Sequence, residues 1–442
     1  MFKSWKYIQL AVLIVLIILF AGGYQLPKYT TRLTALAVLA VIDMLYWIPV
    51  SRQLGFKYRR IASFTYWIPL ALLTLFFLAG MLVRYQNWTP FLRIYYPGIL
   101  LISLIGKGIF LIFMLLGDMA MTIPNAIRVM RMKSSLRKRF RRLPVFMNTG
   151  IFVSLFVMIL FVAGMFFWVN NYKVNRVELT FKELPAEFDG YKIVQLSDMH
   201  LGSILTERPI KKIVTLVNEQ HPDLILFTGD LVNFTTNEAL PFEHILSQFK
   251  APDGVFCILG NHDYGEYTQW NSKDEKALND SALFSLYRRI GWNLLRNQNS
   301  LIHRDASTIA IVGVENWSVT KRFGKKGDLK KALQGVEDAD FHILMSHDPT
   351  HWDAEVNQNF PEVILTLSGH THAFQLAVEA GNVKWSPAEW LFKEWAGLYS
   401  DSKASGEKQY LYVSRGTGTL GYPGRIFTRP EITLIVLHRV KD

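Results

Sequence analysis

Cysteine is almost missing from this chain, which holds only Cys257, so an intrachain disulfide and any cysteine-rich zinc site are excluded. Acidic residues are equally scarce in the first 170 residues, which contain 19 Lys/Arg but only Asp43 and Asp118. Histidine is missing from the same part, because all 11 histidines follow residue 199. Residues 171–442 hold the other 29 basic and 34 acidic residues. The net charge of +12 therefore belongs to the first part and argues against nucleic-acid binding.

Long apolar runs explain where that basic charge lies. Five stretches approach or exceed the roughly 20 residues that a helix needs to cross a bilayer, and they lie near 7–26, 33–50, 61–83, 97–121 and 149–170. The first is not read as a signal peptide, because no small-residue cleavage site follows it and four more spans do. Residues 1–170 are therefore predicted to form an all-α membrane domain of five transmembrane helices.

The loops between these stretches alternate in charge. Segment 51–60 carries four basic residues and segment 122–148 carries eight, whereas 24–32 and 84–97 carry two each. By the positive-inside rule the two basic loops and the N-terminus are cytoplasmic. Five crossings then place residues 171–442 outside, in the periplasm or at the cell exterior. The basic run 128–142 is read as a topology determinant, with an anionic-lipid patch as the alternative.

Two charged residues, Asp43 and Lys107, fall within predicted spans, where charge is costly. A structural ion pair or snorkelling is the favoured interpretation, and a transport role is the alternative. The surrounding helices offer few polar residues from which a substrate pathway could be built.

After residue 170 short apolar runs alternate with amphipathic segments, a pattern that predicts a layered α/β domain over 171–442. Helices are predicted at Arg208–Glu219, Phe242–Phe249, Glu275–Ile290 and Leu329–Leu333. Strands are predicted at Arg176–Thr180, Lys192–Leu196, Leu224–Thr228, Val255–Leu259, Thr308–Val314, Phe341–Met345, Val363–Leu367, Gln409–Val413 and Ile432–Leu437.

Five of these strands end in polar residues of one chemical kind. The endings are Asp198-Met-His200, Gly229-Asp230, Gly260-Asn-His-Asp263, Ser346-His-Asp348 and Gly369-His-Thr-His372. Ligands of open α/β sheets gather outside the carboxyl ends of strands, so these side chains are expected to converge. The remaining histidines are read as surface or ordinary structural residues, with His351 near enough to His347 to line the site: His221, His244, His303, His342, His351 and His438.

Carboxylate, imidazole and amide groups without thiolate suit Mn²⁺, Fe or Zn²⁺. The set is too large for one tetrahedral ion and favours two divalent metal ions. Two such ions clamp a phosphate and activate a water between them as hydroxide. The sequence therefore predicts a dinuclear site for phosphate chemistry.

With these motif blocks in this order, residues 174–442 resemble the calcineurin-like metallophosphoesterase superfamily. The resemblance implies a four-layer α/β/β/α sandwich around two mixed sheets. It also implies one metal held by Asp198, His200 and His372, a second held by Asn261, His347 and His370, and Asp230 as the bridge. His262 would be the general acid that protonates the leaving oxygen or would stabilise the phosphate, and Asp263 would orient it.

The closing motifs Tyr412–Thr419, Pro423-Gly-Arg425 and Arg429-Pro-Glu431 look like those of a bacterial membrane-associated branch of that superfamily. That branch includes phosphodiesterases and hydrolases of UDP-diacylglucosamine-type lipids. It commonly has Gly-Gly-Gln after the last histidine, whereas Ala373-Phe374-Gln375 follows here, so Phe374 is expected to narrow the pocket rim.

An aromatic segment over 385–399 bears on the substrate. As an amphipathic helix at the membrane-facing rim it would admit a lipid tail, and the alternative is packing over the sandwich edge. Its aromatic members are Trp385, Trp390, Phe392, Trp395 and Tyr399.

The sequence thus predicts a membrane-anchored dinuclear-metal phosphoesterase. It would hydrolyse a phosphomonoester, phosphodiester or pyrophosphate, with a lipid-linked or envelope-derived phosphate as the first substrate hypothesis and the lipid bilayer as its partner. The alternative is a membrane transporter or sensor whose outer domain only binds a phosphorylated ligand.

Overall fold

The computed structural model describes residues 30–53, 56–131, 144–381, 383–402 and 408–440. The predicted span 7–26 lies outside these residues. The chain divides into a helical unit that ends at Leu160 and an α/β unit that comprises Phe161 onward together with Thr89–Tyr95. Each unit is described by itself below.

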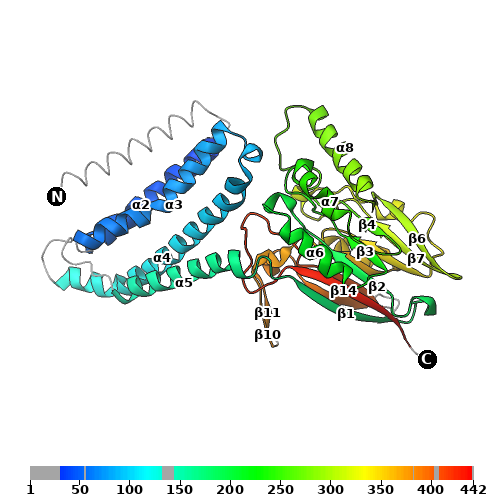
Figure 1. The fold of residues 1–442 in the computed structure, drawn as a ribbon. Helices are drawn as coiled ribbons and strands as arrows, with labels where there is room; N and C mark the ends of the chain where they lie inside the picture. Colours follow the sequence, from blue (N-terminus) through cyan, green and yellow to red (C-terminus); the bar gives the residue numbers. More distant parts are fainter. Residues whose placement is uncertain (1–29, 54–55, 132–143, 382, 403–407, 441–442) are drawn as a thin grey trace. The chain divides into compact units, whose positions relative to one another are not determined.

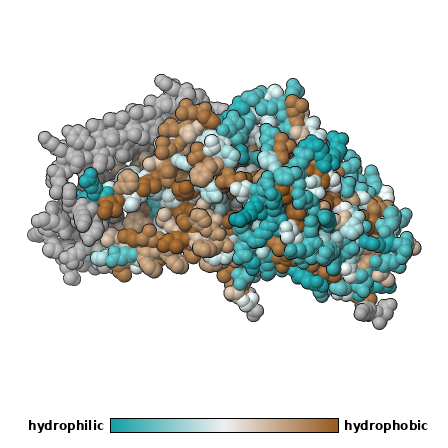
Figure 2. All heavy atoms as spheres, viewed as in Figure 1, coloured by the Kyte–Doolittle hydropathy of each residue, from teal (hydrophilic) through white to brown (hydrophobic). Residues whose placement is uncertain are grey.

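The helical unit is built from four described helices (Figure 1): α2 (Thr30–Gln53), α3 (Phe56–Leu82), α4 (Pro90–Arg131) and α5 (Pro144–Phe167). Among the described residues, three segments are long and apolar enough to span a membrane, namely Arg59–Leu82, Pro90–Pro124 and Pro144–Phe167. Three of the five predicted spans, those near 61–83, 97–121 and 149–170, thus have counterparts among these segments. Helix α2 covers the predicted span 33–50, in which Asp43 is the one charged residue. Apolar side chains cover much of the visible face of the helices (Figure 2).

Two six-stranded mixed sheets form the α/β unit. The first runs in the order β1 (Lys173–Phe181), β14 (Glu431–Arg439), β2 (Lys192–Leu196), β3 (Leu224–Phe227), β4 (Val255–Cys257) and β5 (Trp292–Leu294). The second runs β12 (Gly397–Ser402), β13 (Lys408–Val413), β9 (Val363–Ser368), β8 (Phe341–Met345), β7 (Ser307–Gly313) and β6 (Gln298–Arg304). Strands β2, β3 and β4 are parallel neighbours, as are β8 and β9.

Three buried clusters account for the layering. One cluster packs the first sheet against α6 (Arg208–Asn218), α7 (Glu243–Leu246) and α8 (Lys273–Arg289), which Figure 1 shows on one side of that sheet. A second cluster, with Ile193 and Ile343 among its members, fills the space between the two sheets. A third packs the second sheet against α9 (Leu329–Ala332) and the turn Trp352–Val356. Because β2, β3, β8 and β9 are buried on both faces, their sequences are continuous apolar runs rather than alternating ones.

The structure differs from the predicted elements in three places. The edge strands β5, β6 and β12 and the hairpin β10 (Val378–Ala380) with β11 (Val383–Trp385) were not predicted, because edge strands and short hairpins carry little periodic signal. The helix predicted over 242–249 shortens to α7 with a 3₁₀ turn before it. The aromatic segment 385–399 is not an amphipathic helix. It consists of the end of β11, a 3₁₀ turn at Pro387–Trp390 and the start of β12.

Candidate metal centre

All five predicted strand endings meet at one place. They follow β2, β3 and β4 of the first sheet and β8 and β9 of the second, at the carboxyl ends of parallel strands. Backbone hydrogen bonds join neighbouring endings: Asp198 N donates to Gly229 O at 2.9 Å, and Gly369 N donates to His347 O at 2.9 Å. A Cβ at Gly369 would collide with Asp198 and Ser197, so glycine permits this close approach of the two sheets.

Five of the seven predicted ligands have left-handed backbone. Their φ angles lie between 46° and 70°, and the residues are Asp198, His200, Asp230, His370 and His372. Such backbone costs about 1–3 kcal/mol per non-glycine residue and persists where the surrounding structure enforces it, often at functional sites. This backbone conformation directs the side chains of these five residues toward the metal centre.

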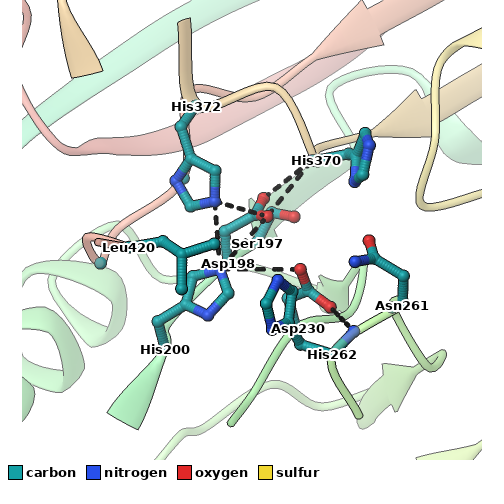
Figure 3. A network of polar contacts seen from close by, with 12 residues as sticks. Ser197, Asp198, His200, Asp230, Asn261, His262, His370, His372 and Leu420 are labelled. Carbon is teal, nitrogen blue, oxygen red and sulfur yellow. Dashed lines mark hydrogen bonds and ion pairs between the residues drawn. The ribbon is translucent and has the colours of Figure 1, made fainter. Parts of the chain in front are cut away.

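The first cluster contains Asp198, His200 and His372. His372 Nε2 lies 3.2 Å from Asp198 Oδ1 and 3.1 Å from His200 Nε2 (Figure 3). Each of these three side chains offers one ligand atom to a common centre, with all three atoms within 4.8 Å of one another. Two imidazole nitrogens that face each other this closely cannot both present lone pairs without a proton or a cation between them.

The second cluster contains Asp230, His347 and His370, whose ligand atoms also lie within 4.8 Å of one another. Asp230 Oδ2 is 3.2 Å from His347 Nε2, and His347 Nε2 is 3.3 Å from His370 Nδ1. The same oxygen lies 3.6 Å from His200 Nε2 of the first cluster. The Asp230 carboxylate therefore lies between the two clusters, where the resemblance implies a bridge.

Asn261 supplies the amide of the predicted set. Its Nδ2 donates to Tyr267 Oη at 2.8 Å, which leaves Oδ1 as a buried acceptor without a hydrogen-bond partner among the described residues. An amide oxygen in that state suits coordination of a hard or borderline cation. The donor set and this orphaned oxygen together fit two divalent metal ions.

The electrostatics of the chain alone show a need for positive charge. Burial would raise the pKa of Asp198, but the His372 imidazole outweighs burial and holds it below its usual range. Burial lowers the pKa of His200 to about 3. Burial also acts to lower the pKa of His347, yet the charge of Asp230 prevails and raises it to about 10. A proton on His347 thus balances Asp230 in the chain alone, a role that a bound cation can take over.

His262 lies beside the clusters without belonging to either. Its Nδ1 is 2.8 Å from the carbonyl oxygen of Asn233, which can only accept, so the proton of a neutral ring sits on Nδ1. Its ring centroid is 5.0 Å from that of His200. Its backbone N donates to Asp230 Oδ1 at 2.9 Å, which orients the bridging carboxylate. Burial lowers the pKa of His262, opposed by the charge of Asp230.

Asp263 does not have the expected contact with the His262 ring. Its carboxylate accepts four backbone hydrogen bonds, at 2.8–3.2 Å, from the N–H groups of Asp230, Leu231, Val232 and Gly260. The residue therefore fixes the loop that carries Asp230, while the carbonyl of Asn233 orients the imidazole. Burial nevertheless raises the pKa of Asp263 to about 7, with the charge of Asp230 adding to it.

Three residues support the ligands through contacts that the sequence alone does not show. Asp348 Oδ2 lies 3.6 Å from His370 Nε2, on the far side of that ring from the second cluster. Tyr267 holds the Asn261 amide, as above. The fully buried Arg425 donates through Nη2 to the carbonyls of Arg415, Gly416 and Gly418, in the loop packed against Asp198.

The other histidines take up structural or surface positions. His342 Nε2 bonds the carbonyl of Val336 at 2.7 Å. His351, which was expected near the site, is fully buried, with Nδ1 2.9 Å from Ser346 Oγ and its ring stacked on Trp317 at 4.5 Å. It does not line the metal centre.

Comparison with known proteins agrees with this geometry. Residues 191–374 match the pattern of the calcineurin-like phosphoesterases. The chain is 31% identical over 279 residues to an uncharacterised metallophosphoesterase, YkuE, of Bacillus subtilis, an alignment that covers 61% of this chain and 87% of that protein.

Two further relatives carry more information in their names. A transmembrane protein with a metallophosphoesterase domain from Danio rerio is 33% identical, over 60% of this chain and 57% of that protein. The UDP-2,3-diacylglucosamine pyrophosphatase LpxG of Chlamydia trachomatis is 29% identical, over 66% of this chain and 98% of that protein. With its two linked His/Asp clusters, the chain therefore belongs to the calcineurin-like metallophosphoesterase family and is a hydrolase of phosphoester bonds.

Proposed function

We propose that the protein is a membrane-anchored phosphohydrolase that cleaves a lipid-linked phosphate ester or pyrophosphate. The observation that carries the proposal is the bridging position of Asp230, between two ligand clusters and directly beside His262. Support for a lipid-linked substrate comes from the similarity to a UDP-2,3-diacylglucosamine pyrophosphatase. The apolar helices keep the catalytic unit next to a bilayer.

The residues divide the work of hydrolysis. Asp198, His200 and His372 would hold one metal ion, and Asn261, His347 and His370 the other, with Asp230 shared. Bound divalent ions supply Lewis acidity toward phosphoryl oxygens and lower the pKa of water at the site. In the reaction water adds to phosphorus, the bond to the leaving oxygen breaks, and that oxygen needs a proton.

His262 is the residue placed to provide that proton. The Asn233 carbonyl holds the Nδ1–H, so Nε2 is the nitrogen left to carry and donate a second proton. Because burial lowers its pKa, the ring is neutral in the chain alone, and the negative charge of a bound phosphate favours its protonation. Asp263 acts indirectly, through the loop of Asp230.

We further propose that the α/β unit lies outside the cytoplasmic membrane. The charge of loops 51–60 and 122–148 supports a cytoplasmic location for those segments. Protease treatment of intact cells or spheroplasts tests this placement. We expect cleavage within residues 171–442, and full protection of that region would overturn it.

The activity is tested with full-length protein in nanodiscs, supplied in turn with Mn²⁺, Fe²⁺ or Zn²⁺. We expect hydrolysis of the soluble bis-p-nitrophenyl phosphate and of UDP-2,3-diacylglucosamine embedded in the disc. Rates from Asp230→Asn and His262→Ala variants show whether this site is responsible. Binding of the lipid without turnover under all three metals would instead favour a sensor that only binds a phosphorylated ligand.

A further inference from the structure

A group of apolar side chains beside the metal centre is exposed to solvent. We define the rim as Phe374, Val383, Trp385, Trp390 and Leu391. Trp390 is 76% exposed and Leu391 is 71% exposed. Large apolar side chains gathered at one surface usually mark an interaction site. The rim is therefore expected to contact an apolar partner.

The other aromatic side chains of the segment pack inward. Phe392 and Trp395 are buried with Ala373 and Ala388 in a small core of their own. Packing over the sandwich edge thus accounts for these two aromatics and leaves Trp390 and Leu391 outside it. The fold does not need the exposed pair, since neither contributes to that core.

The rim borders the metal centre. The buried Phe392 contacts the His370 ring, with centroids 5.4 Å apart. Phe374 follows the ligand His372 by two residues, and its ring lies 6.4 Å from that of Phe392. On the other flank the rings of Trp385 and Trp390 are 6.1 Å apart. The rim is therefore joined to His370 through Phe392 and to His372 through the chain itself.

The last turns of α5, which belong to the α/β unit, show where the bilayer lies. Helix α5 has 24 residues, about 36 Å at 1.5 Å per residue, and the hydrocarbon core is about 30 Å thick. Its final turn therefore emerges at the level of the lipid headgroups. Arg425 N donates to Gly164 O at 3.2 Å, and the rings of Tyr422 and Phe161 lie 5.2 Å apart.

The loop docked on α5 is tied directly to the rim. Ile426 N donates to Gln375 O at 2.8 Å, and Ala377 N donates to Ile426 O at 3.2 Å. Gln375 is the neighbour of Phe374, and Ser386 Oγ, beside Trp385, donates to Ala373 O at 2.7 Å. A short chain of hydrogen bonds thus connects the emerging membrane helix to the rim.

We propose that the rim rests in the interfacial region of the membrane that holds the protein, so that the metal centre acts on phosphate groups of lipids within that bilayer. Tryptophan and leucine suit this position, because tryptophan prefers the headgroup level and leucine the acyl boundary. This inference rests on the proposed function for its substrate. The proposed contact between rim and bilayer does not depend on that function.

The contact is tested by fluorescence, independently of activity. Because Cys257 is buried, a Leu391→Cys variant gives one exposed thiol for an environment-sensitive nitrobenzoxadiazole label. The matched control is Leu278→Cys on α8, since Leu278 is also 71% exposed. In phosphatidylcholine–phosphatidylglycerol nanodiscs we expect the label at 391 to shift to shorter wavelength and to resist quenching by iodide. The label at 278 should show neither change. Equal quenching at both positions overturns the proposal.

The consequence for substrate choice is tested with a Trp390→Ser/Leu391→Ser variant. We expect its rate on UDP-2,3-diacylglucosamine in nanodiscs, divided by its rate on bis-p-nitrophenyl phosphate, to fall about tenfold or more, since burial of large apolar groups is worth at least that factor. An unchanged ratio contradicts presentation of the lipid by the rim. If the unmodified protein hydrolyses neither compound, the proposed function fails, while the fluorescence result still decides the contact with the bilayer.

Discussion

Both units of this protein bury carboxylates, but they satisfy them in different ways. In the helical unit Asp43 forms an ion pair with Lys107, whose Nζ also lies 4.4 Å from the centre of the Tyr66 ring. In the α/β unit Asp198 and Asp230 face imidazole nitrogens and an orphaned amide oxygen. The first arrangement brings its own cation, which fits a structural ion pair rather than a transport role. The carboxylates of the second arrangement have their negative charge balanced only by protons or by bound metal ions.

This difference separates stability from function. In the Asp43–Lys107 ion pair, which we call the closed pair, each charge is already neutralised by the other, so the pair has little capacity to bind a ligand. It mainly fixes how the helices pack. An open set of acceptors, carried here on left-handed backbone, is available to bind a cation. A variant that alters the Asp43–Lys107 pair should therefore leave the His/Asp clusters unchanged, and a variant of the clusters should leave the pair unchanged.

The largest effect is expected from Asp230→Asn, because this carboxylate links the two clusters. Activity should fall at least about 10³-fold, as when one member of a concerted catalytic set is removed. Metal content by mass spectrometry should fall as well. The control is Asp305→Asn, an exposed residue with a similar positive φ of 51°. Wild-type metal content in Asp230→Asn would contradict the bridging role.

His262→Ala should lower kcat by about 10²–10⁴-fold, the range of a lost general acid. Metal content should stay unchanged, because His262 belongs to neither cluster. His303→Ala, at an exposed histidine of β6, serves as the control. A loss of bound metal in His262→Ala would make the residue a ligand rather than a proton donor.

Breaking the closed pair should affect stability alone. Asp43→Asn leaves the Lys107 ammonium buried without its partner, which costs about 3 kcal/mol or more. We expect earlier thermal unfolding of the helical unit in nanodiscs, with unchanged metal content in the α/β unit. A double variant, Asp43→Leu with Lys107→Met, should recover most of the loss. Lost function with full stability in these variants would revive a transport or signalling role.

Metal removal should affect the stability of the α/β unit, which holds the two His/Asp clusters, and leave the helical unit unchanged. Chelation is expected to lower the stability of the α/β unit by about 3 kcal/mol per ion if each ion was present at 100 times its dissociation constant. The raised pKa of His347 adds a dependence on pH. Its stabilising proton is fully bound below pH 6.5 and is lost as the pH rises toward about 10. Metal-free protein should therefore lose stability across that window.

Thermal unfolding measured at several pH values checks this window. The metal-loaded protein should keep its stability there, because the ions replace the proton on His347. A metal-free protein that gains stability between pH 6.5 and 10 would contradict the pairing of His347 with Asp230.

The sequence was sufficient for the position of the site because every group of ligands directly follows an apolar strand. Strands β2, β3, β8 and β9 are buried on both faces, and their runs are unmistakable. The left-handed φ angles of the ligands have no local signal in the sequence, and neither does the hydrogen bond from Arg425 N to Gly164 O. The exposure of Trp390 and Leu391 could not be predicted for the same reason. Composition alone does not show which side chains of the segment are buried in a core.

The smallest effect is expected from Tyr267→Phe, which tests whether the amide of Asn261 is held in place. The variant keeps the ring that lies 4.4 Å from the His262 ring and removes only the acceptor of the Asn261 Nδ2 hydrogen bond. A net hydrogen bond is worth about 0.5–1.5 kcal/mol, so kcat/KM should fall about two- to tenfold.

Metal titration separates orientation from general damage in Tyr267→Phe. The affinity for the second ion should weaken, because the freed amide can turn its nitrogen toward the cluster, while the first ion should bind as before. Tyr287→Phe is the matched control, because the hydroxyl of Tyr287 is buried without a hydrogen-bond partner among the described residues. Equal weakening of both ions would place the effect in the loop rather than in the amide. A small effect of this kind would show that the metal affinity of the cluster depends on the orientation of its neutral ligands as well as on the charge of the bound ion.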